Sequence, residues 1–175
     1  FDVLQAVQLL DTQQPGRYHL NLCGSFVSAK TETPVEVYDE STLHAYIKKN
    51  GLEECVTYHG QVIGKQKEKQ FTQANIFLLP TSYPWEGQPL SIIEALAFSI
   101  PVISCNHKGI PEMVEPGRTG LFVKPKAPRS IASAIIDITE DSGRYSNMSL
   151  AAREYYEANF KREVHLNKLI KVIYG

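Results

Sequence analysis

Apolar residues recur along the chain with two spacings, one typical of helices and one of strands. Val3, Ala6, Val7 and Leu10 lie at helical spacing, which predicts an amphipathic helix that ends near Gln14. Further helices are predicted at residues 42–49, 65–74, 89–98, 110–115, 130–139, 145–159 and 161–174. Short runs of apolar and β-branched residues predict strands at residues 18–23, 55–58, 76–79, 101–104 and 120–123. Residues 27–34 are polar and predict a turn.

The alternation of short strands with helices indicates the fold class. Parallel neighbouring strands need a crossover connection, usually a helix, so this order predicts an α/β fold with a doubly wound, Rossmann-like parallel sheet. We interpret residues 1–175 as one domain whose last part, residues 141–175, forms C-terminal helices. Apolar residues at helical spacing in that tail predict packing against the core; they include Leu150, Tyr155, Tyr156, Phe160, Val164, Leu169, Ile170 and Ile173.

Composition excludes several classes of protein. Of the 175 residues, 43% are hydrophobic and 21% are charged, which is typical of a globular protein and not of a disordered one. The formal net charge of -1 argues against a nucleic-acid partner, because binding to nucleic acid selects a basic surface. The sequence also lacks an apolar run of about 18 or more residues that could span a membrane.

The cysteines and histidines do not indicate a metal site. Cys23, Cys55 and Cys105 fall inside or beside strand-like runs and lack metal-ligand spacing, so we expect them to be reduced and buried in a cytoplasmic protein. The five histidines are not arranged as a catalytic triad or a metal motif. These residues therefore predict no metal site.

Ligand binding is expected at the carboxyl ends of the predicted strands. In open α/β sheets the ligand crevice lies beyond these ends, and the loop after residues 76–79 is the most informative one. Pro89 fits the first helical position after it, where a missing N–H costs nothing. Free N–H groups at a helix start favour a phosphate or diphosphate, because the positive end of the helix dipole lies behind them. Here these groups belong to Gly87, Gln88, Leu90 and Ser91.

Two carboxylates flank this helix start. Glu86 precedes it, and Glu94 lies about 7 Å deeper along the helix than Pro89. The two can therefore contact different groups of one extended ligand, such as a nucleotide sugar, whose hydroxyls donate to carboxylates. The alternative is structural: Glu86 would be a favourable anion near a helix N-terminus, and Glu94 an exposed or satisfied polar position.

Several short motifs in fixed order carry a resemblance to a known family. They read Phe77-Leu-Leu-Pro80-Thr-Ser82, Glu86-Gly-Gln-Pro-Leu90, Glu94-Ala-Leu-Ala97, Pro101-Val-Ile-Ser104, Gly109-Ile-Pro-Glu112 and Gly120-Leu-Phe-Val123. On these motifs the sequence resembles the C-terminal, donor-binding domain of retaining glycosyltransferases of the GT-B fold, family 4, the group 1 glycosyl transferases. Weaker similarity extends over essentially the whole chain.

The resemblance implies a role for each matching residue. Glu86 would lie at the donor sugar as the catalytic residue, and Glu94 would bind the ribose hydroxyls. The turn that includes Gly60 and Val62 resembles the family's nucleobase contact, and Gly24 with Ser25 resembles its glycine turn near the phosphates. For both turns ordinary turn chemistry is an equal alternative. The implied donor-binding residues are Gly24, Ser25, Gly60, Val62, Gly87, Gln88, Pro89, Leu90, Ser91 and Glu94.

The sequence also departs from the family pattern. Ser99 and Lys108 stand where the family usually has glycine, which puts the backbone approach there in question, and Gln88-Pro89 stands where many members carry Phe-Gly. The family's first strand, with an Arg and a Lys that clamp the diphosphate, and its N-terminal acceptor domain would lie upstream of Phe1. We therefore expect a donor-binding segment that is inactive alone and whose sheet has unpaired edges beside that central strand.

The resemblance implies retaining, metal-independent transfer of a hexose from a UDP- or GDP-linked donor in bacterial surface polysaccharide biosynthesis (capsule, exopolysaccharide or lipopolysaccharide). It also implies that no cofactor is used. The acceptor would be a sugar or lipid-linked sugar bound through the upstream domain. The enzyme would be cytoplasmic, with peripheral association at the inner face of the membrane left open. Two alternatives remain: a non-catalytic nucleotide-binding or regulatory Rossmann-like module, and a sugar-nucleotide epimerase of the same fold.

Overall fold

The computed structural model describes residues 1–26 and 39–174 and divides the chain into two compact units. Unit 1 comprises Phe1–Gln70 and unit 2 comprises Phe71–Gly175, whereas the sequence is interpreted above as one domain. Each unit has its own parallel sheet, and no strand pairing joins the two sheets within the described residues. The turn predicted at residues 27–34 lies outside those residues.

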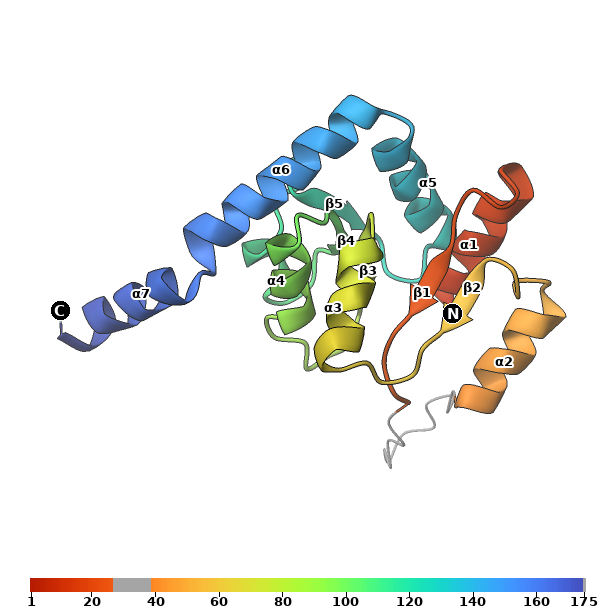
Figure 1. Ribbon diagram of the computed structural model, residues 1–175, viewed down its shortest axis with the longest axis horizontal. Helices are drawn as coiled ribbons and strands as arrows, with labels where there is room; N and C mark the ends of the chain where they lie inside the picture. The colour runs from red at the N-terminus through yellow and green to blue at the C-terminus, as the bar shows by residue number, and fades with distance from the viewer. Residues whose placement is uncertain (27–38, 175) are drawn as a thin grey trace. The chain divides into compact units, whose positions relative to one another are not determined.

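Unit 1 is built on two parallel strands and the helices next to them in sequence. Its elements are α1 (Asp2–Gln13), β1 (Leu20–Leu22), α2 (Glu40–Lys49) and β2 (Val56–Tyr58), and α3 (Gly64–Gln73) then leads on to unit 2 (Figure 1). Leu20 of β1 lies opposite Val56 of β2, so the two strands end at the same edge. The apolar face of each helix packs onto them; the buried core is Leu4, Val7, Leu43, Ile47, Leu52, Cys55 and Val56.

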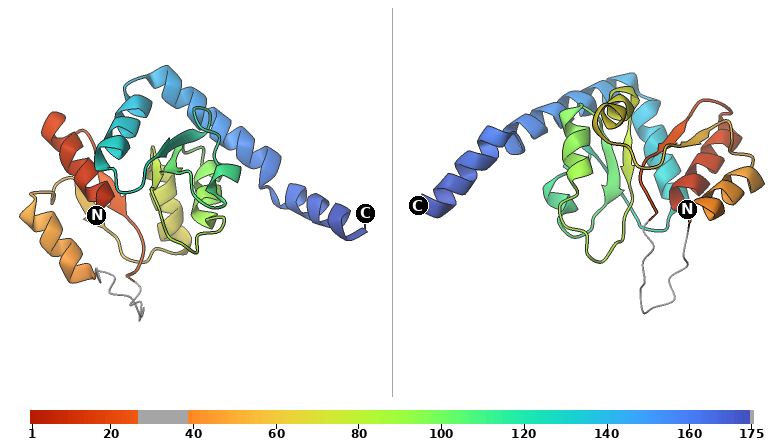
Figure 2. Two further views of the ribbon diagram at one scale, coloured as in Figure 1. Left: turned by 180° about the vertical axis from the view of Figure 1, so that it is seen from behind. Right: turned by 60° about the horizontal axis from the view of Figure 1, so that its bottom comes forward.

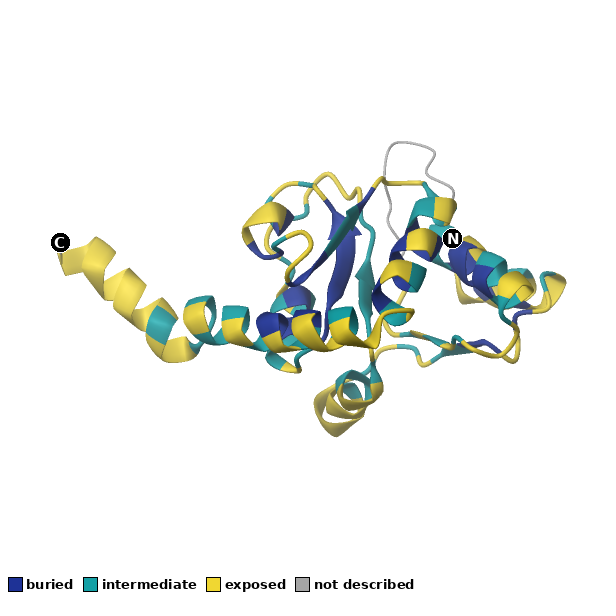
Figure 3. Ribbon diagram, turned by 90° about the horizontal axis from the view of Figure 1, so that it is seen from above, coloured by how far each residue is buried: buried dark blue, intermediate teal, exposed yellow. Residues whose placement is uncertain are grey.

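Unit 2 is a three-stranded parallel sheet covered by helices. Its elements are β3 (Phe77–Leu79), α4 (Leu90–Ala97), β4 (Val102–Cys105), the 3-10 turn η1 (Ile110–Glu112), β5 (Gly120–Val123), α5 (Pro128–Thr139), α6 (Ser142–Asn159) and α7 (Arg162–Tyr174). The strand order is β3-β4-β5. All four residues of the central strand β4 are buried (Figure 3). Every strand predicted from the sequence is present in the two units, and the helix predicted at 110–115 is only this short 3-10 turn.

The C-terminal helices differ from one another in burial. Tyr155, Tyr156 and Phe160 pack against the core of unit 2, as predicted. By contrast, α7 has no buried residue and extends away from the rest of unit 2 (Figure 2), and Ile173 is 62% exposed. The prediction of core packing is therefore wrong for α7, and also for Leu150 of α6, which is 62% exposed. Helical spacing alone does not show which surface an apolar face packs against. No helix of the described chain is both long and apolar enough to cross a membrane.

Candidate functional site

The loop between β3 and α4 carries the two predicted carboxylates. Glu86 is half-buried in the loop, and Glu94 is half-buried in the second turn of α4. The helix begins at Leu90, and Pro89 is its N-cap, with φ -62° and an extended ψ of 117°. The prediction of Pro89 as the first helical residue is thus wrong by one position. Its φ is nonetheless within the helical range, because the proline ring fixes it there.

The start of α4 leaves four backbone donors without acceptors. No side chain caps the helix, and the first loop-to-helix bond is the one from the Ile92 N–H to the Pro89 carbonyl, at 3.0 Å. Within the described residues nothing accepts from the N–H groups of Gly87, Gln88, Leu90 and Ser91. These donors lie at the positive end of the α4 dipole, so the segment is suited to the oxygen atoms of an anion such as a phosphate.

Residues that follow β4 brace this segment through three contacts. His107 Nε2 lies 2.8 Å from the Tyr83 carbonyl oxygen, to which it must donate because a carbonyl only accepts. Gln88 Nε2 donates to Glu112 Oε2 at 2.9 Å. Gly109 approaches so closely that an added Cβ would lie 2.7 Å from the Gly87 carbonyl oxygen. The four free N–H groups are therefore held in place before any ligand binds.

Sequence reasoning missed these bracing residues. His107 and Glu112 were given no role, because each meets a partner 24 residues away, and no local spacing indicates such a contact. The sequence contained a partial signal, because Gly109 and Glu112 are the first and last residues of one of the motifs quoted above. Trp85, which is 84% exposed and directly precedes Glu86, was also given no role.

The two departures from the glycine pattern keep a glycine-like backbone. Ser99 has φ 62° and Lys108 has φ 52°, both in the left-handed region that glycine adopts without strain. The Ser99 carbonyl also accepts from Ser149 Oγ at 2.7 Å, which ties the end of α4 to α6. The substitutions therefore change the side chains at these positions and leave the course of the backbone as a glycine would set it.

In unit 1 the predicted turn residues meet at the carboxyl edge of the sheet. The Gly24 N–H donates to the Gly60 carbonyl at 2.8 Å, and the Tyr58 hydroxyl donates to the Gly24 carbonyl at 3.0 Å. Gly24 has φ 144° and Gly60 has φ 63°, and glycine adopts both conformations without the steric cost of a Cβ. Ser25 is exposed beside Gly24, and Val62 lies half-buried two residues after Gly60.

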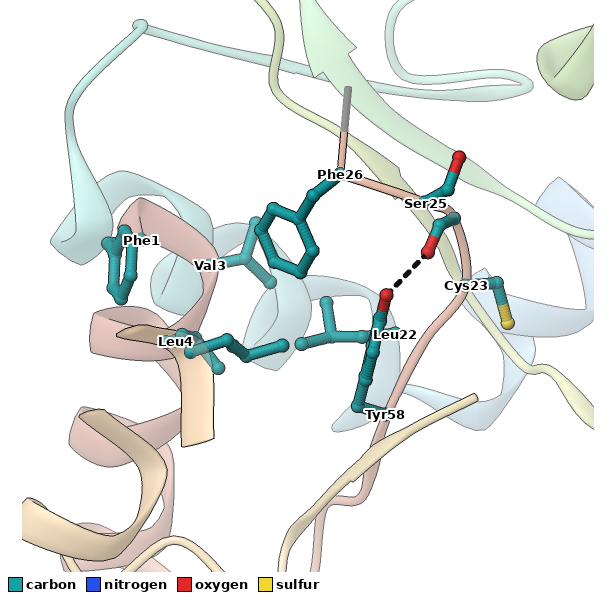
Figure 4. A pocket seen from close by; sticks show the side chains of 10 residues that line it. Phe1, Val3, Leu4, Leu22, Cys23, Ser25, Phe26 and Tyr58 are labelled. Atoms are coloured by element: carbon teal, nitrogen blue, oxygen red, sulfur yellow. Dashed lines mark hydrogen bonds between the residues drawn. The ribbon is translucent and has the colours of Figure 1, made fainter. Parts of the chain in front are cut away.

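An apolar pocket of about 390 Å³ lies beside Gly24 and Ser25 within unit 1 (Figure 4). Most of its lining is carbon: the residues are Phe1, Val3, Leu4, Leu22, Cys23, Gly24, Ser25, Phe26, Leu43 and Tyr58. Such a surface favours an apolar group and not a phosphate, because it offers few hydrogen-bond donors. The pocket therefore gives no support to a phosphate contact at this turn.

The cysteines are only partly as predicted. Cys55 and Cys105 are buried and form no disulfide, as expected, whereas Cys23 is exposed and also forms none. Cys23 lies just beyond the end of β1, where the strand no longer covers it, so the prediction of burial is wrong for this residue. Partial burial of its sulfur still raises the pKa of the Cys23 thiol above its ordinary value.

A second hollow, of about 460 Å³, lies in unit 2 but away from the predicted ligand edge. It contains Arg118, which comes before β5 and therefore lies towards the amino end of that strand. Its two arginines already have acidic partners: Arg118 pairs with Glu115 at 2.6 Å, and Arg144 with Asp137 at 2.5 Å. In the part of the chain that the structure describes, no three His, Cys, Asp or Glu residues gather in a way that could hold a metal ion.

Known proteins share this sequence pattern. The family model of the group 1 glycosyl transferases matches residues 1–155. The amylovoran biosynthesis glycosyltransferase AmsK of Erwinia amylovora is 28% identical over 138 residues, which are 77% of this chain and 34% of that protein. O-antigen chain mannosyltransferase B of Escherichia coli is 28% identical over 139 residues, which are 79% of this chain and 33% of that protein. The chain thus spans about a third of the length of these curated relatives.

Solved structures share the fold. HepE of Anabaena, crystallised in complex with UDP, matches with a TM-score of 0.83 at 19% identity, over 98% of this chain and 44% of that chain. The C-terminal domain of the group 1 glycosyl transferase LpcC from Francisella tularensis matches with a TM-score of 0.66 at 19% identity, over 90% of this chain and 93% of that chain. The predicted Rossmann-like α/β fold of GT-B glycosyltransferases is confirmed. By sequence family and by fold, the chain belongs to the group 1 glycosyl transferases.

Proposed function

We propose that this chain binds the nucleoside-diphosphate sugar donor of a retaining, family 4 hexosyltransferase. The observation that carries the proposal is the row of four N–H groups without acceptors between Glu86 and Glu94. A diphosphate needs several donors in a fixed arrangement, and the bracing by His107, Gly109 and Glu112 provides it. We propose a UDP- or GDP-linked donor; the structural relative HepE, whose solved complexes contain UDP and UDP-glucose, supports the UDP-linked one.

In this proposal each group of the loop has a separate chemical role. The free N–H groups and the α4 dipole stabilise the negative charge that builds on the leaving diphosphate. Glu86 lies beside the donor sugar, where a carboxylate stabilises the positive charge of an oxocarbenium-like transition state. Glu94, deeper on α4, accepts from the ribose hydroxyls. In this proposal the transfer is metal-independent, because the backbone donors supply the positive potential that a metal ion would otherwise provide.

The family resemblance also implies a nucleobase contact, which we include in the proposal. The turn after β2, with Gly60 and Val62, would contact the base, and the hydrogen bond from Gly24 to Gly60 holds that turn in place. We further propose a cytoplasmic enzyme of surface polysaccharide synthesis with a sugar or lipid-linked acceptor. This follows the relatives that act in amylovoran and O-antigen synthesis.

The first experiment is a calorimetric titration of the protein with UDP, GDP, ADP and CMP. We expect one nucleoside diphosphate to bind selectively. Glu94→Ala should lower its affinity about tenfold or more, because the carboxylate that accepts hydrogen bonds from two ribose hydroxyls is lost. Glu163→Ala, which removes an exposed carboxylate on α7, is the control and should bind as the unchanged protein does. Absence of binding by all four nucleotides, or equal binding by Glu94→Ala, would contradict the proposal.

Activity assays separate catalysis from binding alone. An intact protein, including the upstream acceptor domain, that binds nucleotide but neither transfers nor hydrolyses any sugar donor would favour the regulatory module. Sugar interconversion without an acceptor would favour an epimerase.

A further inference from the structure

Lys108 combines a strained backbone with a position beside the candidate loop. It has φ 52°, in the left-handed region, and its side chain is exposed. A residue with a Cβ adopts this conformation only at a cost in free energy that glycine avoids, and such residues cluster at functional sites. The structure therefore raises the question of what a lysine does at this position.

Both neighbours of Lys108 contact the segment that holds the free N–H groups. His107 donates to the Tyr83 carbonyl at 2.8 Å, and Gly109 packs against the Gly87 carbonyl. Lys108 is thus fixed between two contacts to this loop. Its long, flexible side chain ends in a compact positive charge with three donors, which suits a phosphate oxygen.

The two described loops around this segment contain one cation. In residues 80–91 and 105–112, Lys108 is the sole Lys or Arg, whereas Glu86 and Glu112 carry negative charge. A diphosphate on the four N–H groups would lie close to Glu86, and like charges repel unless a cation offsets them. Within the described residues no hydrogen bond or ion pair engages Lys108. By contrast, Arg118, Arg144 and Arg153 of unit 2 all have acidic partners.

We propose that Lys108 is a donor-binding residue whose ammonium group contacts the diphosphate. The inference rests on the proposed function and adds a residue to it. Lys108 acts on charge and not on the base or the sugar, so its contribution grows with the number of phosphates on the ligand. The strained backbone is retained because a glycine here would lack that charge.

The test is a calorimetric titration with the nucleoside, its monophosphate and its diphosphate, using the base that the unchanged protein selects. We expect Lys108→Gln to lower the affinity for the diphosphate about tenfold and the affinity for the monophosphate less. The affinity for the nucleoside should not change. Lys108→Arg should retain most of the diphosphate affinity, because it keeps the charge. Lys126→Gln is the matched control, since Lys126 is also an exposed lysine at φ 54°, in the loop after β5.

Lys108→Gly separates a binding role from a structural one. It removes the charge and also relieves the left-handed strain, so thermal stability should rise while diphosphate affinity falls. If Lys108→Gln and Lys108→Gly bind the diphosphate as tightly as the unchanged protein does, the inference is overturned and the proposed function stands. If the unchanged protein binds no nucleoside diphosphate, both are overturned.

Discussion

The two units differ in how firmly they hold the residues expected to bind the donor. In unit 2 the central strand β4 is fully buried, and residues that follow it brace the Glu86 loop by two hydrogen bonds and one close backbone contact. In unit 1 the two strands are only partly buried, and β1 has an exposed central residue. The residues expected to hold the diphosphate thus lie beside the sheet whose central strand is fully buried.

This division fits the demands of the two ends of a nucleotide sugar. Charge develops at the diphosphate during transfer, and donors stabilise it most when they need no rearrangement. A nucleobase undergoes no chemistry, so its contacts tolerate a less buried support. If the comparison is right, unit 2 should unfold at higher denaturant than unit 1, and changes to one unit should leave the protection of the other unaltered.

Gly120→Ala is expected to destabilise unit 2 and to have the largest effect of the substitutions considered. An added Cβ would lie 1.9 Å from the Val102 carbonyl oxygen on the paired strand, far inside any contact distance. We expect unit 2 to lose about 4 kcal/mol or more of its free energy of unfolding, which is exceptional for one methyl group. Hydrogen exchange should show lost protection in β3, β4 and β5.

The control is Gly87→Ala, where an added Cβ meets nothing within 4 Å, so its stability should match that of the unchanged protein. In Gly120→Ala the amides of β1 and β2 should keep their protection. Loss of protection in both units together would show that they unfold as one, and the comparison between them would then fail.

The fold was predictable from the sequence because its signals are local. Helical spacing and short apolar runs between turn residues predicted every strand and nearly every helix, including β5 at Gly120–Val123 with unchanged bounds. What local patterns did not give is the division into two sheets, since strand pairing depends on segments far apart in sequence. The exposure of α7 could not be predicted for the same reason, because an apolar helix face does not show which surface it packs against.

The candidate loop was predictable for a different reason. Pro89 and the motif around Glu86 mark a helix start after a buried strand, and the rule for ligand crevices in α/β sheets applies to that position directly. The bracing by His107 and Glu112 requires the three-dimensional contact between two loops. The conformation of Lys108 is also invisible in the sequence, because a lysine gives no local sign of a left-handed backbone.

Ser99→Gly should sharpen the comparison by stabilising unit 2 alone. Ser99 has φ 62° at the end of α4, and glycine adopts this conformation without the steric cost of a Cβ. We expect a gain of about 1 kcal/mol in the free energy of unfolding of unit 2, measured by denaturant titration. The bond from Ser149 to the Ser99 carbonyl involves only the backbone of Ser99 and is retained. Ser99→Ala is the matched control and should give no gain; equal stabilisation by alanine would rule out the backbone explanation.

The smallest expected effect is a pH dependence confined to unit 1. Asp39 is the N-cap of α2 and accepts from the Thr42 hydroxyl at 2.7 Å and from the Thr42 N–H at 2.8 Å. These hydrogen bonds lower the pKa of Asp39 to about 2, and the bond from the Thr42 hydroxyl has the largest effect. Because the unfolded pKa is near 3.9, the stabilisation is fully present above about pH 4 and is lost as the pH falls through about 2.

Asp39→Asn isolates this contribution, because an asparagine can still cap the helix but carries no charge. We expect the stability of unit 1 in the unchanged protein, relative to Asp39→Asn, to decrease steadily between about pH 4 and pH 2, as read from hydrogen exchange of α2. Unit 2 should show no such difference, since Asp39 lies outside it. A difference that is flat across this range would mean that the Asp39 charge does not hold α2. The lower stability expected for unit 1 would then have to be explained by its less buried sheet alone.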